Sequence, residues 1–83
     1  MWVWTQDEEL VNFDHVEFVR VERDESDREF ELRAYPFQWI ESTEDVFYTL
    51  AARDTPKAAH DVLEEVVGAL SGGTDLLDLR RQP

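Results

Sequence analysis

Few residues in this 83-residue chain have side chains suited to chemistry. It contains two histidines, His15 and His60, and no cysteine, which excludes thiol catalysis, thiolate metal sites and disulfides. His60 and Glu64 have the i, i+4 spacing at which two side chains on one helix face can share a metal ion. Since no third ligand accompanies them, we interpret them as an intrahelical hydrogen-bonded pair. We therefore expect no metal site and no cofactor, and we place His15 at a strand edge.

The other candidates for catalysis are serines, glycines and carboxylates. The serines all fall in expected turns or caps: Ser26, Ser42 and Ser71. None has the context of a nucleophile elbow. The SGGT run at 71–74 follows an expected helix, whereas a phosphate cradle needs a helix N-terminus, and the acidic run at 24–27 is too short for a calcium loop. Paired carboxylates can act in acid–base catalysis, but among twenty acidic residues some pairs lie close by chance, so such a pair is weak evidence for an active site. We therefore expect a protein that is not an enzyme.

Charge is the strongest compositional feature. Twenty acidic residues against eight basic ones give a net charge of −12. Residues 7–31 hold eleven acidic and three basic residues, a net charge of −8. Such a surface repels nucleic acid and anionic lipid, so we expect neither direct nucleic-acid binding nor membrane binding. The charge favours solubility, or attraction to a basic protein surface.

The stretch 16–37 must position much of this charge, and we expect it to form a β-hairpin. It reads VEFVRVER, then the polar break DESD, then REFELRAYPF. Apolar residues change face within the first arm, which indicates burial on both faces or a bulge near 18–20. The second arm alternates apolar and charged residues over 29–34, as a half-buried antiparallel strand does. Pro36 has no N–H for the ladder and should end that strand.

A helix is expected after residue 55. Thr55 suits an N-cap and Pro56 the first helical position, and Gly72 and Gly73 suit the C-terminal end. Gly68 lies inside the helix and suggests close packing on the sheet. The expected apolar stripe comprises Ala59, Val62, Leu63, Val66 and Leu70, widened by Ala58 and Val67. Further short strands are expected at 1–5, 10–15, 45–52 and 74–79; alternatively, 12–14 is a bend that leads into the long strand at Val16.

These elements predict an α+β fold in one domain spanning 1–83. An antiparallel β-meander of about four to five strands carries one C-terminal helix, packed on one sheet face. We expect 80–83 to be a loose tail. The segment ELVNFDHVE at 9–17 and the order of elements resemble a group of small, uncharacterised bacterial and phage proteins. The resemblance implies the same architecture and transfers no activity.

The ten aromatic residues have two open interpretations. With one sheet and one helix, the sheet side away from the helix has no obvious cover. Tyr35, Phe37, Trp39 and Phe47 fall on or near that side by alternation. Exposed aromatics surrounded by charge are typical of a protein interface; alternatively, these residues pack among themselves beneath the 36–45 loop.

The sequence therefore favours an acidic, non-enzymatic interaction module. It would bind a basic protein surface or a second copy of itself. The most specific version of this hypothesis is a phage or mobile-element inhibitor of the anti-CRISPR type, which mimics nucleic acid and binds a basic nucleic-acid-binding surface. The predicted partner-binding residues are Glu17, Glu22, Asp24, Glu25, Asp27, Glu29, Glu31, Tyr35, Phe37 and Trp39. An antidote to a basic nuclease toxin, and a halophile-type protein whose acidity serves solvation alone, stay open as alternatives. Without a signal peptide or a run of about 20 apolar residues, we expect a cytoplasmic protein.

Overall fold

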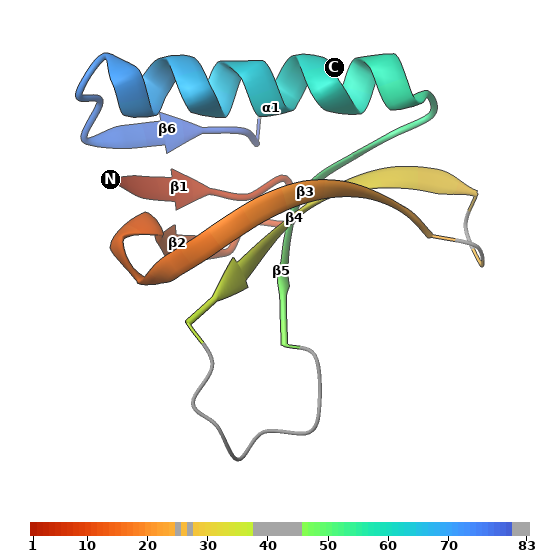
Figure 1. Cartoon of the computed structure of the whole chain (residues 1–83), viewed down its shortest axis with the longest axis horizontal. Coiled ribbons are helices and arrows are strands. Elements are labelled where there is room, and N and C mark those ends of the chain that lie inside the picture. The colour runs from red at the N-terminus through yellow and green to blue at the C-terminus, as the bar shows by residue number, and fades with distance from the viewer. Residues whose placement is uncertain (25, 27, 38–45, 81–83) are drawn as a thin grey trace.

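The computed structural model describes residues 1–24, 26, 28–37 and 46–80, and it has an α+β fold (Figure 1). Its elements, in chain order, are β1 (Trp2–Trp4), β2 (Leu10–Asn12), the 3-10 helix η1 (Phe13–His15), β3 (Val16–Asp24), β4 (Glu29–Pro36), β5 (Tyr48–Arg53), α1 (Pro56–Ser71) and β6 (Leu76–Asp78).

The described strands form two three-stranded sheets, not the single meander that the sequence suggested. One is the expected antiparallel meander β3-β4-β5; the other has the order β2-β1-β6. In the second sheet β1 pairs antiparallel with β2 and parallel with β6. The single-sheet prediction was wrong because η1 turns the chain between β2 and β3, and because β6 takes the free edge of β1 after α1 has returned the chain. Periodicity reveals strands but not their partners.

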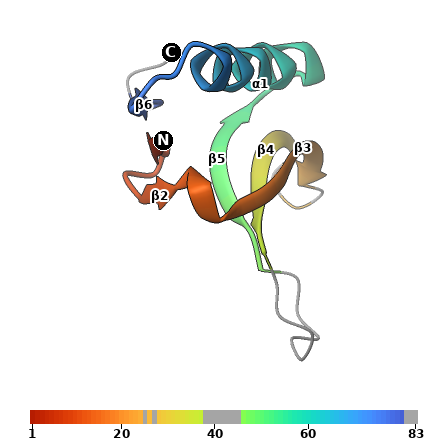
Figure 2. The ribbon, with the colours of Figure 1, turned by 60° about the vertical axis from the view of Figure 1, so that its left-hand side comes forward.

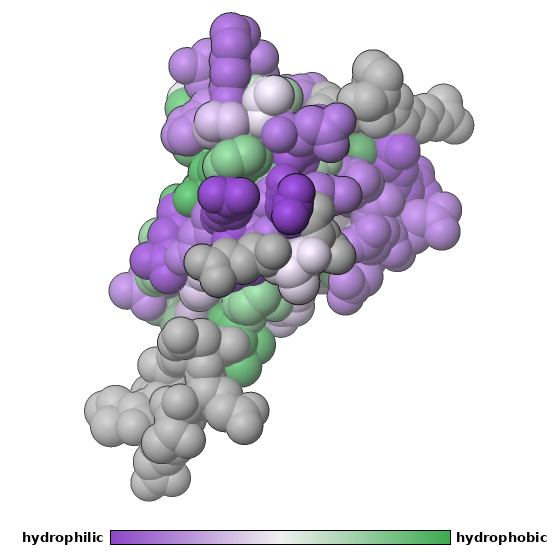
Figure 3. Space-filling view, turned by 90° about the vertical axis from the view of Figure 1, so that its right-hand side faces the viewer, coloured by the Kyte–Doolittle hydropathy of each residue, from purple (hydrophilic) through white to green (hydrophobic). Residues whose placement is uncertain are grey.

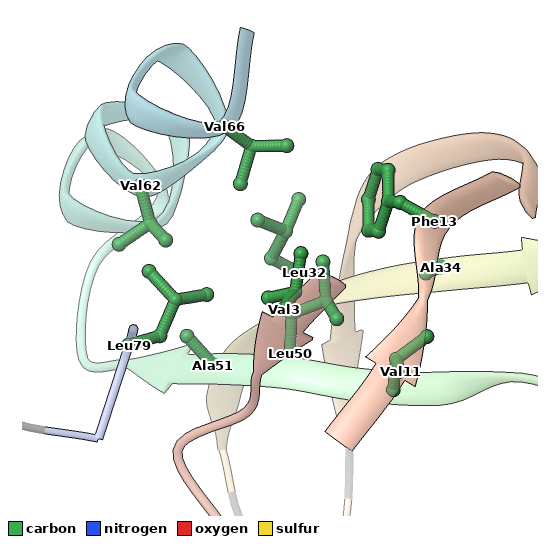
Figure 4. Packing of buried hydrophobic residues seen from close by; sticks show 10 residues of the cluster. All are labelled: Val3, Val11, Phe13, Leu32, Ala34, Leu50, Ala51, Val62, Val66 and Leu79. Carbon is green, nitrogen blue, oxygen red and sulfur yellow. The ribbon is translucent and has the colours of Figure 1, made fainter. Parts of the chain in front are cut away.

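The hydrophobic core lies where the two sheets and the helix meet (Figures 2 and 4). Val3 comes from the β2-β1-β6 sheet, Leu32 and Leu50 from the meander, and Val62 and Val66 from α1. Figure 4 shows the two helix valines pointing toward the strand side chains. The two sheets and α1 each bury one face against this core, so the core is enclosed by these three parts of the domain.

The helix begins and ends as its sequence predicts. The Thr55 hydroxyl accepts a hydrogen bond from the Ala58 N–H at 3.1 Å, and Pro56 is the first helical residue. After Ser71 the chain turns through Gly73, whose φ of 71° is easily reached only by glycine. Within the expected stripe, α1 buries Ala59, Val62 and Val66, whereas Val67 and Leu70 are exposed.

Gly68 does not mark close packing, so that interpretation was wrong. A Cβ atom added at Gly68 would have no other atom within 4 Å, because this residue lies on the exposed side of α1. On the side of α1 that faces the sheets, the buried side chain in this turn is Val66.

The hairpin of β3 and β4 follows its sequence pattern closely. The register shifts between Val16 and Phe18, so Glu17 is a bulge residue just before the segment where the sequence indicated one. The bulge accounts for the change of face in the first arm. In β4, Leu32 and Ala34 are fully buried, and the strand ends at Pro36 as expected.

Gln6 joins the two sheets. Its N–H donates to the Leu50 carbonyl at 2.8 Å, and its side-chain Oε1 accepts from the Ala52 N–H at 2.9 Å. The same Oε1 accepts from Arg53 Nη1 at 2.7 Å. These bonds satisfy part of the outer edge of β5, which the meander alone would leave open.

Candidate protein interface

The outer face of the meander is the surface turned away from α1, and it carries the predicted acidic site. Cross-strand pairing places Phe18 opposite Tyr35, and it sets Arg20 against Arg33 and Glu22 against Glu31. The intervening residues Val19, Val21, Leu32 and Ala34 pack into or against the core. Alternation along the two strands therefore gathers charged and aromatic side chains on one surface.

The carboxylates of this face are neutralised within the chain. Arg33 donates from Nη1 to Glu22 at 2.6 Å and from Nη2 to Glu31 at 2.6 Å. Arg20 pairs through Nε with the other oxygen of Glu22. Arg20 lies opposite Arg33 and Glu22 lies opposite Glu31, so each cross-strand pair carries like charges. The ion pairs between arginine and glutamate offset this repulsion. Glu22 and Glu31 therefore belong to an ion-pair network within the chain.

The pKa values of both arginines are raised above their ordinary value. For Arg20, the hydrogen bond with Tyr35 is the main cause, helped by the charge of Glu22. Burial acts to lower the pKa of Arg33, but its hydrogen bond with Glu31 and the charges of Glu31 and Glu22 outweigh that effect. Both side chains therefore keep their positive charge under all physiological conditions.

An aromatic cluster adjoins the ion-pair network. The rings of Phe18 and Tyr35 stack at 4.6 Å between centroids, and Tyr35 lies 5.7 Å from Phe47. The Arg20 guanidinium lies 4.7 Å from the Tyr35 ring, and Arg33 lies 4.2 Å from Phe47. We call these five residues the arginine–aromatic cluster. Flat rings with cations on their faces are typical of the anchors in protein interfaces.

Exposure within and around the cluster is uneven. Tyr35 is only 5% exposed, whereas Phe18 is 45% exposed; most of the loop beneath which the aromatics were expected to pack lies outside the described residues. Phe37, just after β4, is 61% exposed, with its N–H bonded to the His15 carbonyl at 3.1 Å. Other large apolar residues exposed at this end of the sheet are Val46, Phe47 and Tyr48. Figure 3 shows apolar surface at the end of the sheet where β4 ends and β5 begins, below a mostly hydrophilic face.

The remaining predicted site residues lie elsewhere on β3 and β4 or outside the described residues. Glu17 is exposed in the bulge. Asp24 accepts hydrogen bonds from the N–H of Ser26 at 3.0 Å and from its hydroxyl at 2.7 Å, which shapes the hairpin turn. Glu29 pairs across from Asp24. Three predicted residues lie outside the described residues: Glu25, Asp27 and Trp39.

Sequence reasoning missed a second apolar surface, on the outer face of the β2-β1-β6 sheet. Trp2 is 46% exposed beside Leu76, and Trp4 pairs across from Leu10. Arg80 lies 4.3 Å from the Trp4 ring and is held by Asp78 through hydrogen bonds of 2.8 and 3.0 Å. The alternation of Trp2 and Trp4 had signalled a shared face. The sequence predicted a loose tail at 80–83; Arg80 makes these contacts, and 81–83 lie outside the described residues.

The predictions about metal ligands and His60 can be compared with the described part of the chain. No group of three or more potential metal ligands occurs there. His60 bonds through Nδ1 to the Pro56 carbonyl at 2.8 Å, and not to Glu64 as the sequence suggested. Among the same residues, no helix is long and apolar enough to cross a membrane.

No protein-family model, curated protein or solved structure matches this chain. The resemblance drawn from residues 9–17 therefore stays a prediction, and the function must be argued from the geometry alone.

Proposed function

We propose that this chain is a non-enzymatic interaction module that binds a basic protein surface through the outer face of the meander. The observation that carries the proposal is the arginine–aromatic cluster, with Phe18 and Phe47 exposed over a buried Tyr35. Phe18 is 45% exposed on this face, and the net charge of −12 favours a partner of opposite charge.

The cluster and the carboxylates have different roles in this proposal. Arginine and aromatic side chains at the centre of an interface supply most of the affinity, whereas charges at its rim mainly steer the encounter. Because Glu22 and Glu31 are held by Arg20 and Arg33, they position the cluster and offer little free charge. Glu17, at the start of β3, belongs to the rim.

The finer form of the proposal is an inhibitor that occupies a nucleic-acid-binding groove. The concentration of acidic residues in 7–31 supports it. The ion pairs that Glu22 and Glu31 form with arginine count against the inhibitor form, because a phosphate mimic needs carboxylates that can contact the partner. Competition with duplex DNA distinguishes a contact inside such a groove from one outside it.

The test is affinity capture from a lysate of the source organism at near-physiological salt, followed by binding kinetics with the purified partner. Phe18→Ala is compared with Trp2→Ala, because the two aromatics are exposed to 45% and 46% on different sheets. We expect Phe18→Ala to weaken binding at least about tenfold through faster dissociation, with Trp2→Ala near wild type.

Two results would overturn the proposal. One is equal capture of the same partner by wild type, Phe18→Ala and Trp2→Ala. The other is selective loss with Trp2→Ala, which would move the interface to the β2-β1-β6 sheet. Displacement of a captured partner by duplex DNA would support the inhibitor form, and a partner unaffected by DNA would support binding outside any nucleic-acid groove.

A further inference from the structure

The outer edge of β3 is the longest unpaired sheet edge in the described part of the molecule. β3 runs from Val16 to Asp24 and pairs only with β4, whereas the outer edge of β5 receives hydrogen bonds from Gln6. An unpaired edge presents a row of N–H and C=O groups to any strand that can match it. The bulge at Glu17 disrupts the start of this edge, so the regular part used here extends from Phe18 to Arg23.

We propose that this edge pairs antiparallel with β3 of a second copy of the chain, about a twofold axis at Val21. In this register Val21 lies opposite Val21 of the second copy. Arg20 then lies opposite Glu22 of the second copy, and the symmetry repeats the contact in the other direction. A twofold interface must be self-complementary, and the order Arg20–Val21–Glu22 meets that condition.

Charge and sheet geometry together select this register. A shift of two residues in one direction sets Arg20 against Arg20, and a shift in the other direction sets Glu22 against Glu22. Like charges directly opposite each other destabilise strand pairing. A shift of one residue would set the core side of one copy against the outer face of the other.

The helix side of the same edge offers a further charge match. An open groove of about 230 Å³ adjoins β3 and is lined by Phe13, Val16, Glu17, Phe18, Val19 and Leu70. In the proposed register Arg23 lies opposite Val19 of the second copy, beside that groove and its Glu17. Within the described residues neither Arg23 nor Glu17 forms an ion pair. Dimerisation therefore brings together two opposite charges that lack partners in one copy.

The dimer would join two meanders into one continuous sheet, with both arginine–aromatic clusters on the same side. The force against it is the repulsion between two chains of net charge −12 each. Because salt screens this repulsion beyond a Debye length of about 8 Å at 0.15 M, association is measured at that ionic strength and at a higher one.

Cysteine cross-linking tests the register directly, because the native chain has no cysteine. Only position 21 faces itself across the twofold axis, with Cα atoms about 4.5–5.5 Å apart, within the range that a disulfide spans. We expect oxidised Val21→Cys to form a covalent dimer. The control Val19→Cys should not, because the two copies of residue 19 are offset by roughly 13 Å along the strands. Equal cross-linking of both variants, or none in Val21→Cys, would overturn the proposal.

Charge exchange gives a second test that does not depend on Val21, whose side chain packs against the core. Sedimentation velocity over a concentration series should show wild-type dimers. Arg20→Glu should weaken dimerisation at least about tenfold, because it sets two pairs of glutamates against each other. Adding Glu22→Arg to Arg20→Glu should restore the dimer.

The matched control for this test is Lys57→Glu on α1, which changes the net charge as much as Arg20→Glu but lies on another element. Lys57→Glu should keep the dimer. A wild-type chain that stays monomeric at every concentration and at both salt levels would overturn the proposal. So would a dimer that Arg20→Glu and Lys57→Glu weaken equally.

Discussion

Arg20 on β3 and Arg33 on β4 lie directly opposite each other, and the carboxylate of Glu22 pairs with both guanidinium groups. Glu22 in turn lies opposite Glu31, which binds Arg33 through two hydrogen bonds of 2.6 and 2.8 Å. Directly opposite residues of like charge destabilise a sheet. Here one diagonal contact, Arg33–Glu22, and two contacts along single strands set each arginine beside a carboxylate, so the four side chains form one network.

The first prediction concerns Glu22, which links the two arginines. Glu22→Gln should lower the free energy of unfolding by about 1 kcal/mol, because Arg20 and Arg33 then face each other without their shared carboxylate. Urea unfolding monitored by circular dichroism measures the change. The control Glu64→Gln removes an exposed carboxylate from α1 and should stay within about 0.5 kcal/mol of wild type. Equal effects of both variants would show that the network does not contribute to stability.

The second prediction uses two glycines with opposite conformational requirements. Gly68→Ala should stabilise the chain by about 1 kcal/mol, because the residue is helical and an added Cβ meets no other atom within 4 Å. Gly73→Ala should destabilise it by about 1 kcal/mol, because φ is 71° there. Thermal and urea unfolding of both variants check the signs. A loss of stability in Gly68→Ala would mean that α1 packs more closely than this structure shows.

The third prediction tests how β6 closes the core. Leu79, directly after β6, is fully buried, and its N–H donates to the Trp4 carbonyl at 2.9 Å. Leu79→Ala should cost about 2–4 kcal/mol through lost burial and a cavity. Leu76 lies within β6 and is 52% exposed, so Leu76→Ala should cost less than about 1 kcal/mol. Similar urea midpoints for the two variants would contradict the docking of β6 against the core.

The fourth prediction separates folding from solvation by salt. Because Glu22 and Glu31 are paired and the core is closed on three sides, the chain should show its full circular dichroism signal in dilute buffer. Salt should then raise the unfolding free energy modestly, since it screens the self-repulsion of a chain at −12. A chain that folds only in molar salt would support the halophile-type alternative instead.

Local sequence signals predicted the individual elements well. Thr55 and Pro56 located the helix start, Gly72 and Gly73 its end, and Pro36 the end of β4. Each of these signals acts within a few residues, through a hydrogen bond or an allowed range of φ, so the sequence contains the whole cause. The bulge beside Phe18 was one of the two alternatives that the change of face left open, because an extra residue in one strand moves the apolar side chains that follow it to the opposite face.

The candidate site was predicted only in part. Alternation placed Tyr35 on or near the face away from the helix, and Tyr35 lies there opposite Phe18. The sequence did not reveal which arginines pair with the two carboxylates, because the pairing depends on the cross-strand register. Nor did it reveal that Phe18 and Phe47 enclose Tyr35.

By itself, the sequence determined the α+β class, the hairpin, the capped helix and a net charge of −12. Only the tertiary structure decided that the strands divide into two sheets, that β6 pairs parallel with β1, and which charges meet. The physical reason is the range of the interactions. Caps, turns and alternation are local, whereas strand partners and ion pairs are chosen by the competition of distant segments for one small core.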